Sequence, residues 1–478
     1  MDEAAWHEAA NMGPVVMQRI TFIAACVGLL GGCVAGELGD PIAVMTDHQA
    51  GYNKRRAAAI QAESQFPQDP KRIAALEKIL WMPRYPAWQR CYAVDQLVVH
   101  DEQAFRRSLL HRFNLLRDVK TINHIFNLAI DRKWRELTPI AVQNYAQYVH
   151  GVADKDRTER RVITQLNPGR TVEDVIFDIF CIQDSVTSTK DRIAAWELLF
   201  RLVAHESLIG RLMNAPDTDP LVTDLKAAAS LHLLPSNREE LLWLLYIRDP
   251  QRQSFWRSSV DIVRRLQPEQ RQGLALRHLP VLATLSTDQL ALGRKILVEQ
   301  IDATIHNGSS FMAGPTYDGQ MERWPQRFSH WRQSMCWADL IAIDWLLSAM
   351  HDRRVVAEIF RQADADHQDI GTEYGGVVSV VDGRPAVKGY EPMYRQHDRK
   401  FIPPQEMIEH LYQAVAHYHF HAQKHKNSRY AGPGDGDIKL ANRLQFNFLV
   451  FTFIDRDRLN VDYYQPGRVV IDLGTVRR

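Results

Sequence analysis

Three histidines alternate with two aromatic residues in the run His417-Tyr418-His419-Phe420-His421. Because successive side chains of a β-strand point to opposite faces, a strand here would place all three imidazoles on one face and both aromatic rings on the other. Neutral imidazole is the commonest protein ligand for zinc, and two imidazoles two residues apart on a strand can reach one ion. The run therefore predicts a metal-binding strand, with a polar, half-exposed strand carrying incidental histidines as the alternative.

Carboxylates that could complete the site follow in the segment 431–437, Ala-Gly-Pro-Gly-Asp-Gly-Asp, which leads from a loop into a predicted helix. We predict that Asp437 joins His419 and His421 as a zinc ligand. Asp435 is a rival to Asp437, and His417 is a rival to one member of the histidine pair. Three protein ligands leave a fourth tetrahedral position for water, which is the arrangement of a catalytic zinc rather than a structural one.

The water at such a site becomes a nucleophile at neutral pH when a nearby base takes its proton. Glu373 is the candidate base, because it stands directly before a predicted strand that begins Tyr374-Gly375-Gly376. Glycines beside the base would let the backbone approach a substrate or a neighbouring strand closely.

A glutamate ahead of a glycine-containing strand, a His-x-His pair and a later aspartate together resemble the signature of the JAMM (JAB/MPN) metalloproteases. The resemblance covers the chain from about residue 350 onward. It implies that His419, His421 and Asp437 hold zinc and that Glu373 activates the zinc-bound water. It also implies a part in oxyanion stabilisation for position 434, where the family has a serine.

Two departures from the family pattern concern this last role and the loop between the ligands. Gly434 has no hydroxyl to donate, so transition-state stabilisation would have to come from backbone N–H groups, the metal or another side chain. Ala422 stands where a proline commonly follows the second histidine, and the loop up to Pro433 is longer than usual for the family. Metal binding is therefore more firmly expected than activity.

The elements that must position these residues are predicted to form one α/β (α+β) domain over residues 350–478. Their order is α-β-β-α-β-α-β-β-β. The predicted helices span 353–365, 404–416 and 436–444, and the predicted strands span 374–381, 386–390, 417–421, 446–454, 459–464 and 468–473.

Residues 67–349 carry a succession of amphipathic helical patterns, which predicts an all-α region and a multidomain chain. Several pieces look like helix pairs, for example 88–100 followed by 101–116. This texture resembles HEAT-like solenoids, in which helix pairs stack on their neighbours, although no strict period is present. An irregular helical bundle is the alternative. The tryptophans of this region are expected in the core.

The first 33 residues are predicted to be a secretion signal. An apolar run, 20–30, follows Arg19, and the sequence Leu30-Gly31-Gly32-Cys33 resembles a bacterial lipobox. Cys33 would then carry a lipid that anchors the protein to a membrane. Residues 34–66, rich in small and polar residues, would form a linker. A short buried helix that happens to contain Cys33 is the alternative.

Composition narrows the class of protein. Lys plus Arg number 58 and Asp plus Glu number 57, so the chain lacks the broad positive charge of a dedicated nucleic-acid binder. The five cysteines are far apart and show neither zinc-finger nor disulfide-scaffold spacing. The sequence also contains no phosphate-binding loop, dinucleotide motif, GxSxG or HExxH.

These observations lead to the hypothesis of an exported lipoprotein of the bacterial cell envelope, facing the periplasm, with a zinc-dependent peptidase or isopeptidase domain. Its substrate would be a protein or peptide, and its helical region would present a substrate or a protein partner. A catalytically silent JAMM-like scaffold is the alternative, and a zinc hydrolase of a non-peptide substrate is a third hypothesis. Without the lipobox, the protein would be cytoplasmic.

Overall fold

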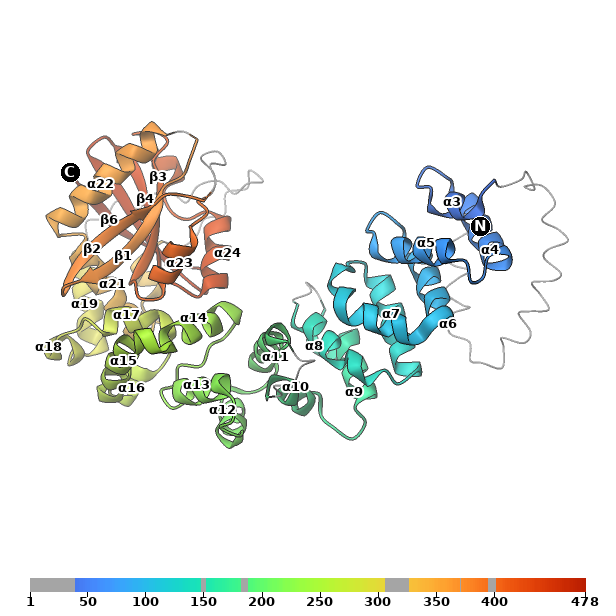
Figure 1. Ribbon diagram of the computed structural model, residues 1–478. Coiled ribbons are helices and arrows are strands. Elements are labelled where there is room, and N and C mark those ends of the chain that lie inside the picture. The colour runs from blue at the N-terminus through green and yellow to red at the C-terminus, as the bar shows by residue number, and fades with distance from the viewer. Residues whose placement is uncertain (1–38, 148–151, 182–187, 306–325, 370, 394–400) are drawn as a thin grey trace. The chain divides into compact units, whose positions relative to one another are not determined.

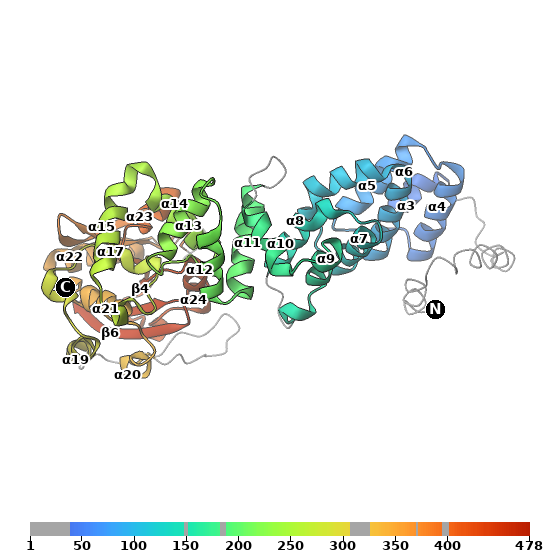
Figure 2. The same cartoon turned by 90° about the horizontal axis from the view of Figure 1, so that it is seen from below.

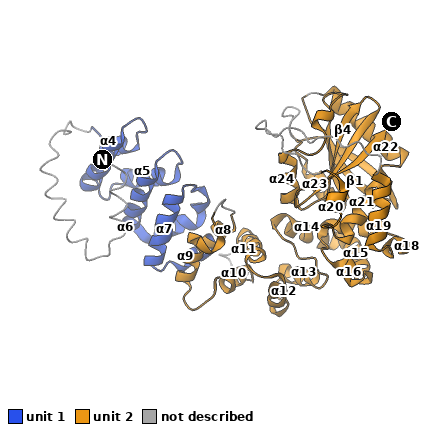
Figure 3. Ribbon diagram, turned by 180° about the vertical axis from the view of Figure 1, so that it is seen from behind, with its two compact units in different colours: residues 1–140 blue, residues 141–478 orange. Residues whose placement is uncertain are grey.

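The computed structural model describes residues 39–147, 152–181, 188–305, 326–369, 371–393 and 401–478. The chain divides into two compact units, residues 1–140 and residues 141–478 (Figure 3). The predicted order of a helical region followed by an α/β domain is confirmed. The predicted signal segment with Cys33 lies outside the described residues. No helix within the described residues combines the length and the apolar character needed to cross a bilayer.

The first unit is helical from Pro41, which corrects the expectation of a linker over residues 34–66. Asp40 caps the first helix through the N–H of Ile42, and Pro41 occupies its first turn. The second helix buries three alanines, a narrow face that gives only a weak apolar period although alanine favours helix strongly. The helices of this unit are α3 (Pro41–Thr46), α4 (Tyr52–Gln65), α5 (Pro70–Trp81), α6 (Ala87–Arg112) and α7 (Val119–Asp131), with short 3-10 turns at Phe113–Leu115 and Arg135–Leu137.

The predicted helix pair 88–100 and 101–116 appears as α6 with a break at Asp101. This residue has extended backbone angles (φ −154°, ψ 92°), and its side chain accepts a hydrogen bond from the N–H of Ala104. Asp101 therefore ends one helical run and caps the next.

The second unit begins with a long helical stretch that is not a separate body. Trp243 donates its indole N–H to the carbonyl of Tyr412 at 2.8 Å and packs against Phe446, so α14 is buried against the strand-containing part. Residues 141–478 form one compact unit, so the predicted domain start at residue 350 lies inside this unit, and α14 adjoins the strand-containing part (Figures 1 and 2). The helices are α8 (Thr138–Ala146), which spans the division, α9 (Thr158–Leu166), α10 (Val172–Cys181), α11 (Thr189–Leu202), α12 (His205–Asn214), α13 (Pro220–Ala229), α14 (Arg238–Arg248), α15 (Gln253–Arg265), α16 (Pro268–Arg271), α17 (Leu279–Leu282), α18 (Thr287–Leu290), α19 (Arg294–Ile305), α20 (Phe328–Trp331) and α21 (Trp337–Ala349).

Six strands form one mixed sheet in the order β2-β1-β3-β4-β5-β6. β3 and β4 run parallel, and the other neighbouring pairs are antiparallel. The predicted order of elements is confirmed, although the helix predicted at 404–416 ends at Leu411. The bounds are α22 (Arg353–Gln368), β1 (Gly375–Val381), β2 (Arg384–Tyr390), α23 (Gln405–Leu411), β3 (Ala416–His421), α24 (Asp435–Leu444), β4 (Phe448–Asp455), β5 (Arg458–Gln465) and β6 (Val469–Arg477).

The two faces of this sheet differ in chemistry. On one face, the Tyr418 hydroxyl donates to Gln362 of α22 at 2.5 Å, and Phe453 packs against Phe360 of the same helix. The opposite face carries the odd-numbered histidines of β3 together with the even-numbered residues of β4 and β5, since residues in register across strands point to the same side. The aromatic face therefore packs against α22, and the opposite face carries the candidate metal ligands of β3.

Candidate metal centre

β3 lies between β1 and β4 and holds its histidines in the middle of the sheet. Tyr418 and Phe420 are fully buried on the α22 side, so the strand cannot slip by one residue without turning its imidazoles away from the site. Gly375 allows close packing beside β3, because a Cβ atom there would lie 2.7 Å from the carbonyl oxygen of Tyr418 and 2.9 Å from the ring of Phe401. The glycines after Glu373 thus serve strand packing.

The amino end of α24 brings the aspartate to this strand. Gly434 is the N-cap, and its N–H donates to Oδ2 of Asp437 at 2.8 Å. This single capping bond holds the Asp437 carboxylate over the first turn, where the helix dipole also favours a negative charge. As a result, Oδ2 of Asp437 lies 3.6 Å from Nε2 of His419.

His419, His421 and Asp437 converge as a group that could hold a metal ion. Each offers one ligand atom, and these atoms all lie within 4.8 Å of one another. His419 is buried, and its Nε2 atom has no hydrogen-bond partner within the described part of the chain. Two ligands bound to zinc at tetrahedral angles lie about 3.3 Å apart, close to the 3.6 Å between His419 and Asp437. The buried nitrogen without a hydrogen bond and the spacing of the ligand atoms both fit a metal ion.

Glu373 lies beside the same nitrogen. Its side chain is largely buried just before β1, and Oε1 lies 3.7 Å from Nε2 of His419. It lies in the segment before β1, and so comes from a different part of the chain than the histidines on β3 and Asp437 on α24. The structure therefore brings together all four residues to which the sequence assigned a metal or proton-transfer role.

Both histidines are oriented through their second ring nitrogen. Nδ1–H of His421 donates to the carbonyl of Tyr430 at 2.6 Å, which fixes the tautomer and leaves Nε2 for an ion. Nδ1 of His419 lies 3.5 Å from the buried hydroxyl of Tyr464 on β5. Such second contacts are the usual way in which proteins aim metal-binding imidazoles.

Asn427 organises the loop that supplies the Tyr430 carbonyl. Its side chain is buried and donates to the carbonyl of His421 at 3.0 Å, and its carbonyl accepts from the N–H of Tyr430 at 2.8 Å. The backbone N–H of Asn427 donates to the carbonyl of Phe453 on β4. Sequence reasoning missed Asn427 and Tyr464; the only available signal was the unusual length of the loop after His421.

Charges around the ion site are strongly coupled. Burial lowers the pKa of His419, but the nearby carboxylates of Asp437 and Glu373 outweigh burial and raise this pKa to about 9. The pKa of Asp437 is held well below its usual range, because attraction to His419 exceeds the opposing effect of burial. Burial, followed by the charge of His419, lowers the pKa of His421 to about 4. The site therefore holds one proton that a metal ion would replace.

The two rival ligands stay outside the group. His417 is a neutral core residue, packed between the rings of Phe401 and Phe448, and burial lowers its pKa to about 3. Asp435 is half-buried at the start of α24 and does not belong to the group either. Within the described residues, the ligand assignment therefore favours Asp437 and the pair His419 and His421.

A second cluster, His278, Cys336 and Asp339, has ligand types but not the chemistry of a metal site. Nδ1 of His278 accepts from the N–H of Ala275, and Nε2 lies 2.9 Å from Oδ1 of Asp339, so both nitrogens are engaged. Arg277 donates to the same carboxylate at 2.8 Å. Burial raises the pKa of Cys336 to about 12, so its thiol stays protonated. We assign this cluster to the packing of α21.

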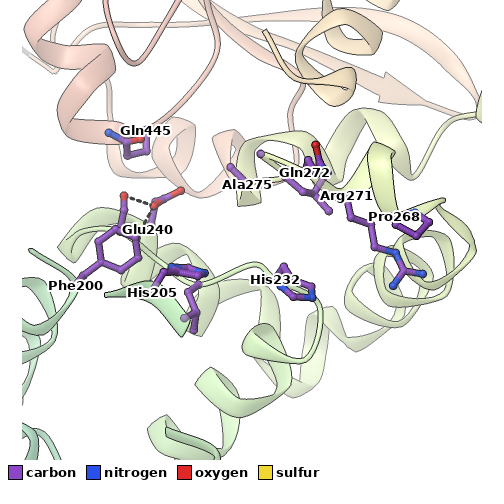
Figure 4. A pocket seen from close by; sticks show the side chains of 13 residues that line it. Phe200, His205, His232, Glu240, Pro268, Arg271, Gln272, Ala275 and Gln445 are labelled. Carbon is purple, nitrogen blue, oxygen red and sulfur yellow. Dashed lines mark hydrogen bonds between the residues drawn. The ribbon is translucent and has the colours of Figure 1, made fainter. Parts of the chain in front are cut away.

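A cavity of about 500 Å³ lies between the helical stretch and the carboxyl end of α24 (Figure 4). Its buried carboxylate, Glu240, accepts hydrogen bonds from the N–H and hydroxyl of Ser236 at 2.7 and 2.6 Å. The cavity shares no residue with the metal group. Its lining residues are Phe200, His205, His232, Leu234, Ser236, Glu240, Pro268, Arg271, Gln272, Gly273, Leu274, Ala275 and Gln445.

Zinc should bind more tightly as the pH rises toward 9. With a pKa of about 9, His419 is protonated at neutral pH and zinc must displace that proton, whereas His421 is already neutral. We expect the apparent affinity to rise about tenfold per pH unit between about pH 6 and about pH 8, with about one proton released per ion. Calorimetry in buffers of different ionisation enthalpy measures both quantities. A flat profile over this range would contradict the charge arrangement described above.

Comparison of the chain with protein-family models, with curated proteins and with solved structures finds no match in any of the three.

Proposed function

We propose that the C-terminal part of this chain is a JAMM-like, zinc-dependent hydrolase that cleaves an amide, peptide or isopeptide bond. The observation that carries the proposal is the convergence of His419, His421 and Asp437 with Glu373 around one buried imidazole nitrogen, which has two carboxylates nearby but no hydrogen bond among the described residues. Two histidines and one carboxylate with a nearby glutamate are a donor set typical of catalytic zinc rather than structural zinc.

Zinc at such a site polarises a carbonyl and lowers the pKa of water toward neutrality. Glu373 is placed to accept a proton from the attacking water and to pass it to the leaving amine, since its Oε1 lies 3.7 Å from the ligand atom of His419. Its burial also keeps bulk water from competing for that proton. His421 stays aimed by Tyr430, so its ligand atom is in position before substrate arrives.

The wider setting of the proposal comes from the sequence. A protein or peptide is the substrate class, the helical region would present this substrate or a protein partner, and a lipid on Cys33 would tether the molecule to the bacterial cell envelope on its periplasmic side. The balanced charge argues against nucleic acid as the partner.

The experiment that tests the function is cleavage by the full-length protein of a peptide library and of an isopeptide-linked conjugate, followed by mass spectrometry. We expect cleavage with zinc, loss of cleavage after treatment with a chelator and recovery when zinc is returned. Cleavage that persists in the chelator would exclude a metal-dependent mechanism. No cleavage of any substrate by zinc-loaded protein would favour a scaffold.

A catalytically silent scaffold is the second candidate, and Gly434 is the observation that favours it, because no hydroxyl stands at this position. Serine fits here: the backbone has an ordinary φ of −82°, and an added Cβ would meet only Oδ2 of Asp437, at 3.6 Å. Serine is also a good N-cap residue, so stability should change by only a few tenths of a kcal/mol.

Gly434→Ser should therefore raise turnover by about 100-fold, since one oxyanion donor is typically worth this much or more. The rate of substrate cleavage and the zinc content are measured together. Unchanged turnover with zinc still bound would mean either that the domain is silent or that another group already stabilises the oxyanion. Gly436→Ser is the matched control. Gly436 lies two residues later, in the first turn of α24, and has open space for a Cβ atom.

A further inference from the structure

Four oxygen-bearing side chains stand next to one another on the histidine face of the sheet. Thr452 on β4 pairs in register with Asn460 on β5, and Asp462, two residues further along β5, pairs with Asp472 on β6. His419 pairs with Val450, and Val450 pairs with Asp462. Because paired residues point to the same side of a sheet, the four side chains lie on the same face as the metal centre. We call Thr452, Asn460, Asp462 and Asp472 the oxygen cluster.

Three of these side chains are completely buried, and two of them carry an oxygen without a hydrogen bond. Thr452, Asn460 and Asp462 are fully buried, and among the described residues Oγ1 of Thr452 and Oδ1 of Asn460 have no hydrogen-bond partner. Nδ2 of Asn460 donates to Oδ2 of Asp462 at 2.8 Å. This hydrogen bond does not involve Oδ1 of Asn460. Buried oxygens without partners are rare in native proteins, and a bound ion is one explanation for them.

The charges of the cluster point to a cation as that ligand. Asp462 and Asp472 face each other across β5 and β6, and both are buried. Burial, followed by repulsion from Asp472, raises the pKa of Asp462 well above its usual value. Two adjacent buried carboxylates need either a shared proton or a positive ion between them.

We propose that the oxygen cluster binds a hard divalent cation, with calcium as the representative ion, at a second site distinct from the zinc centre. Carboxylate, amide and hydroxyl oxygens are the ligands that calcium prefers, whereas the neighbouring zinc group is built on imidazole. The four side chains supply part of the six to eight ligands that calcium takes, and backbone carbonyls or water supply the rest. This inference does not depend on the proposed hydrolase activity.

The cation would also support the loop that carries the zinc ligand. The N–H of Gly432 approaches Asp462 and stabilises its ionised form. Gly432 has a φ of +85° and begins the short segment that ends in the N-cap of α24. A cation would keep Asp462 ionised. The Asp462 carboxylate would then remain a hydrogen-bond acceptor for the N–H of Gly432, at the start of the segment that leads to α24.

The test is calcium binding by the full-length protein after removal of divalent ions, measured by titration calorimetry and by the shift in thermal unfolding midpoint. Zinc is added first, so that the imidazole site is filled. We expect calcium to bind at about one ion per chain and to raise the midpoint. Asp462→Asn should abolish binding, and Thr452→Val, which keeps shape and charge, should weaken it at least tenfold.

Two controls separate this site from its surroundings. Asp457→Asn removes an exposed carboxylate of the β4–β5 turn and should leave calcium binding unchanged. The double variant His419→Ala, His421→Ala should lose zinc but keep calcium, which distinguishes failure of this inference from failure of the hydrolase proposal. No calcium effect on the wild-type protein overturns the inference, as does binding that survives both cluster variants. An Asp462→Asn protein that is more stable without any calcium response would assign the cluster to a shared proton instead.

Discussion

Replacing His419 and His421 together with alanine should remove zinc from this protein altogether. We expect the purified wild-type chain to carry about one zinc ion and the double variant to carry essentially none, as measured by elemental mass spectrometry. The reason is geometric: the two imidazoles and Asp437 offer ligand atoms within 4.8 Å of one another, and one carboxylate alone cannot hold a transition metal at low concentration.

His417→Ala is the matched control for that experiment, because this histidine lies on the same face of the same strand but packs between Phe401 and Phe448. It should retain zinc, although it leaves a small cavity in the core. Circular dichroism checks that each variant is folded. An absence of zinc from the wild-type protein, even after zinc is added back, would remove the basis of the hydrolase proposal.

The chemistry of the site could be anticipated because it rests on short-range patterns. Alternation in residues 417–421 requires the three imidazoles to share one face once the segment is a strand, and the structure places Ala416–His421 as β3. The residues Asp382-Gly383, between the predicted strands 374–381 and 386–390, are a similar local signal, since both adopt the positive φ angles that a tight hairpin needs. Glycine-rich turns and period-two alternation are local signals that tertiary packing rarely overrides.

What could not be anticipated depends on contacts between distant segments. Nothing in the sequence says that α14 buries Trp243 against Tyr412, 169 residues later, and this contact joins α14 to the strand-containing part. The buried face of α4 could not be predicted either. It consists of alanines, whose small side chains give only a weak apolar periodicity yet allow close helix packing. The sequence motif already ranked Asp437 ahead of Asp435, but the structural reason for this choice, the N-cap at Gly434, is a detail of backbone geometry.

The same distinction applies to the electrostatics of the site. Sequence spacing identified ligand types, but the protonation of His419 arises because Asp437 and Glu373 approach one nitrogen from two different elements. Because the two carboxylates raise the pKa of His419, zinc would have to displace a proton from this residue. Metal binding is then an exchange of cations in a preformed cage, which reduces the reorganisation that binding would otherwise require.

Glu373→Gln should abolish turnover while leaving zinc in place. Glutamine has the same shape and can still accept a hydrogen bond, but it cannot take a proton, and a positioned general base typically contributes about 100- to 10,000-fold to the rate. We expect a loss of this size in the rate of cleavage for any substrate found by the library screen. Zinc content should stay at about one ion per chain, because the three assigned ligands are untouched.

Glu391→Gln is the control, since it makes the same chemical change at an exposed position after β2 and should leave the rate unaltered. Retained turnover in Glu373→Gln would show that another group carries the proton, and the assignment of Glu373 as base would fall while the metal site stood. Loss of zinc together with activity would instead make Glu373 a fourth ligand. The 3.7 Å separation from Nε2 of His419 is compatible with a ligand as well as with a base, so zinc content and rate must be measured on the same preparation.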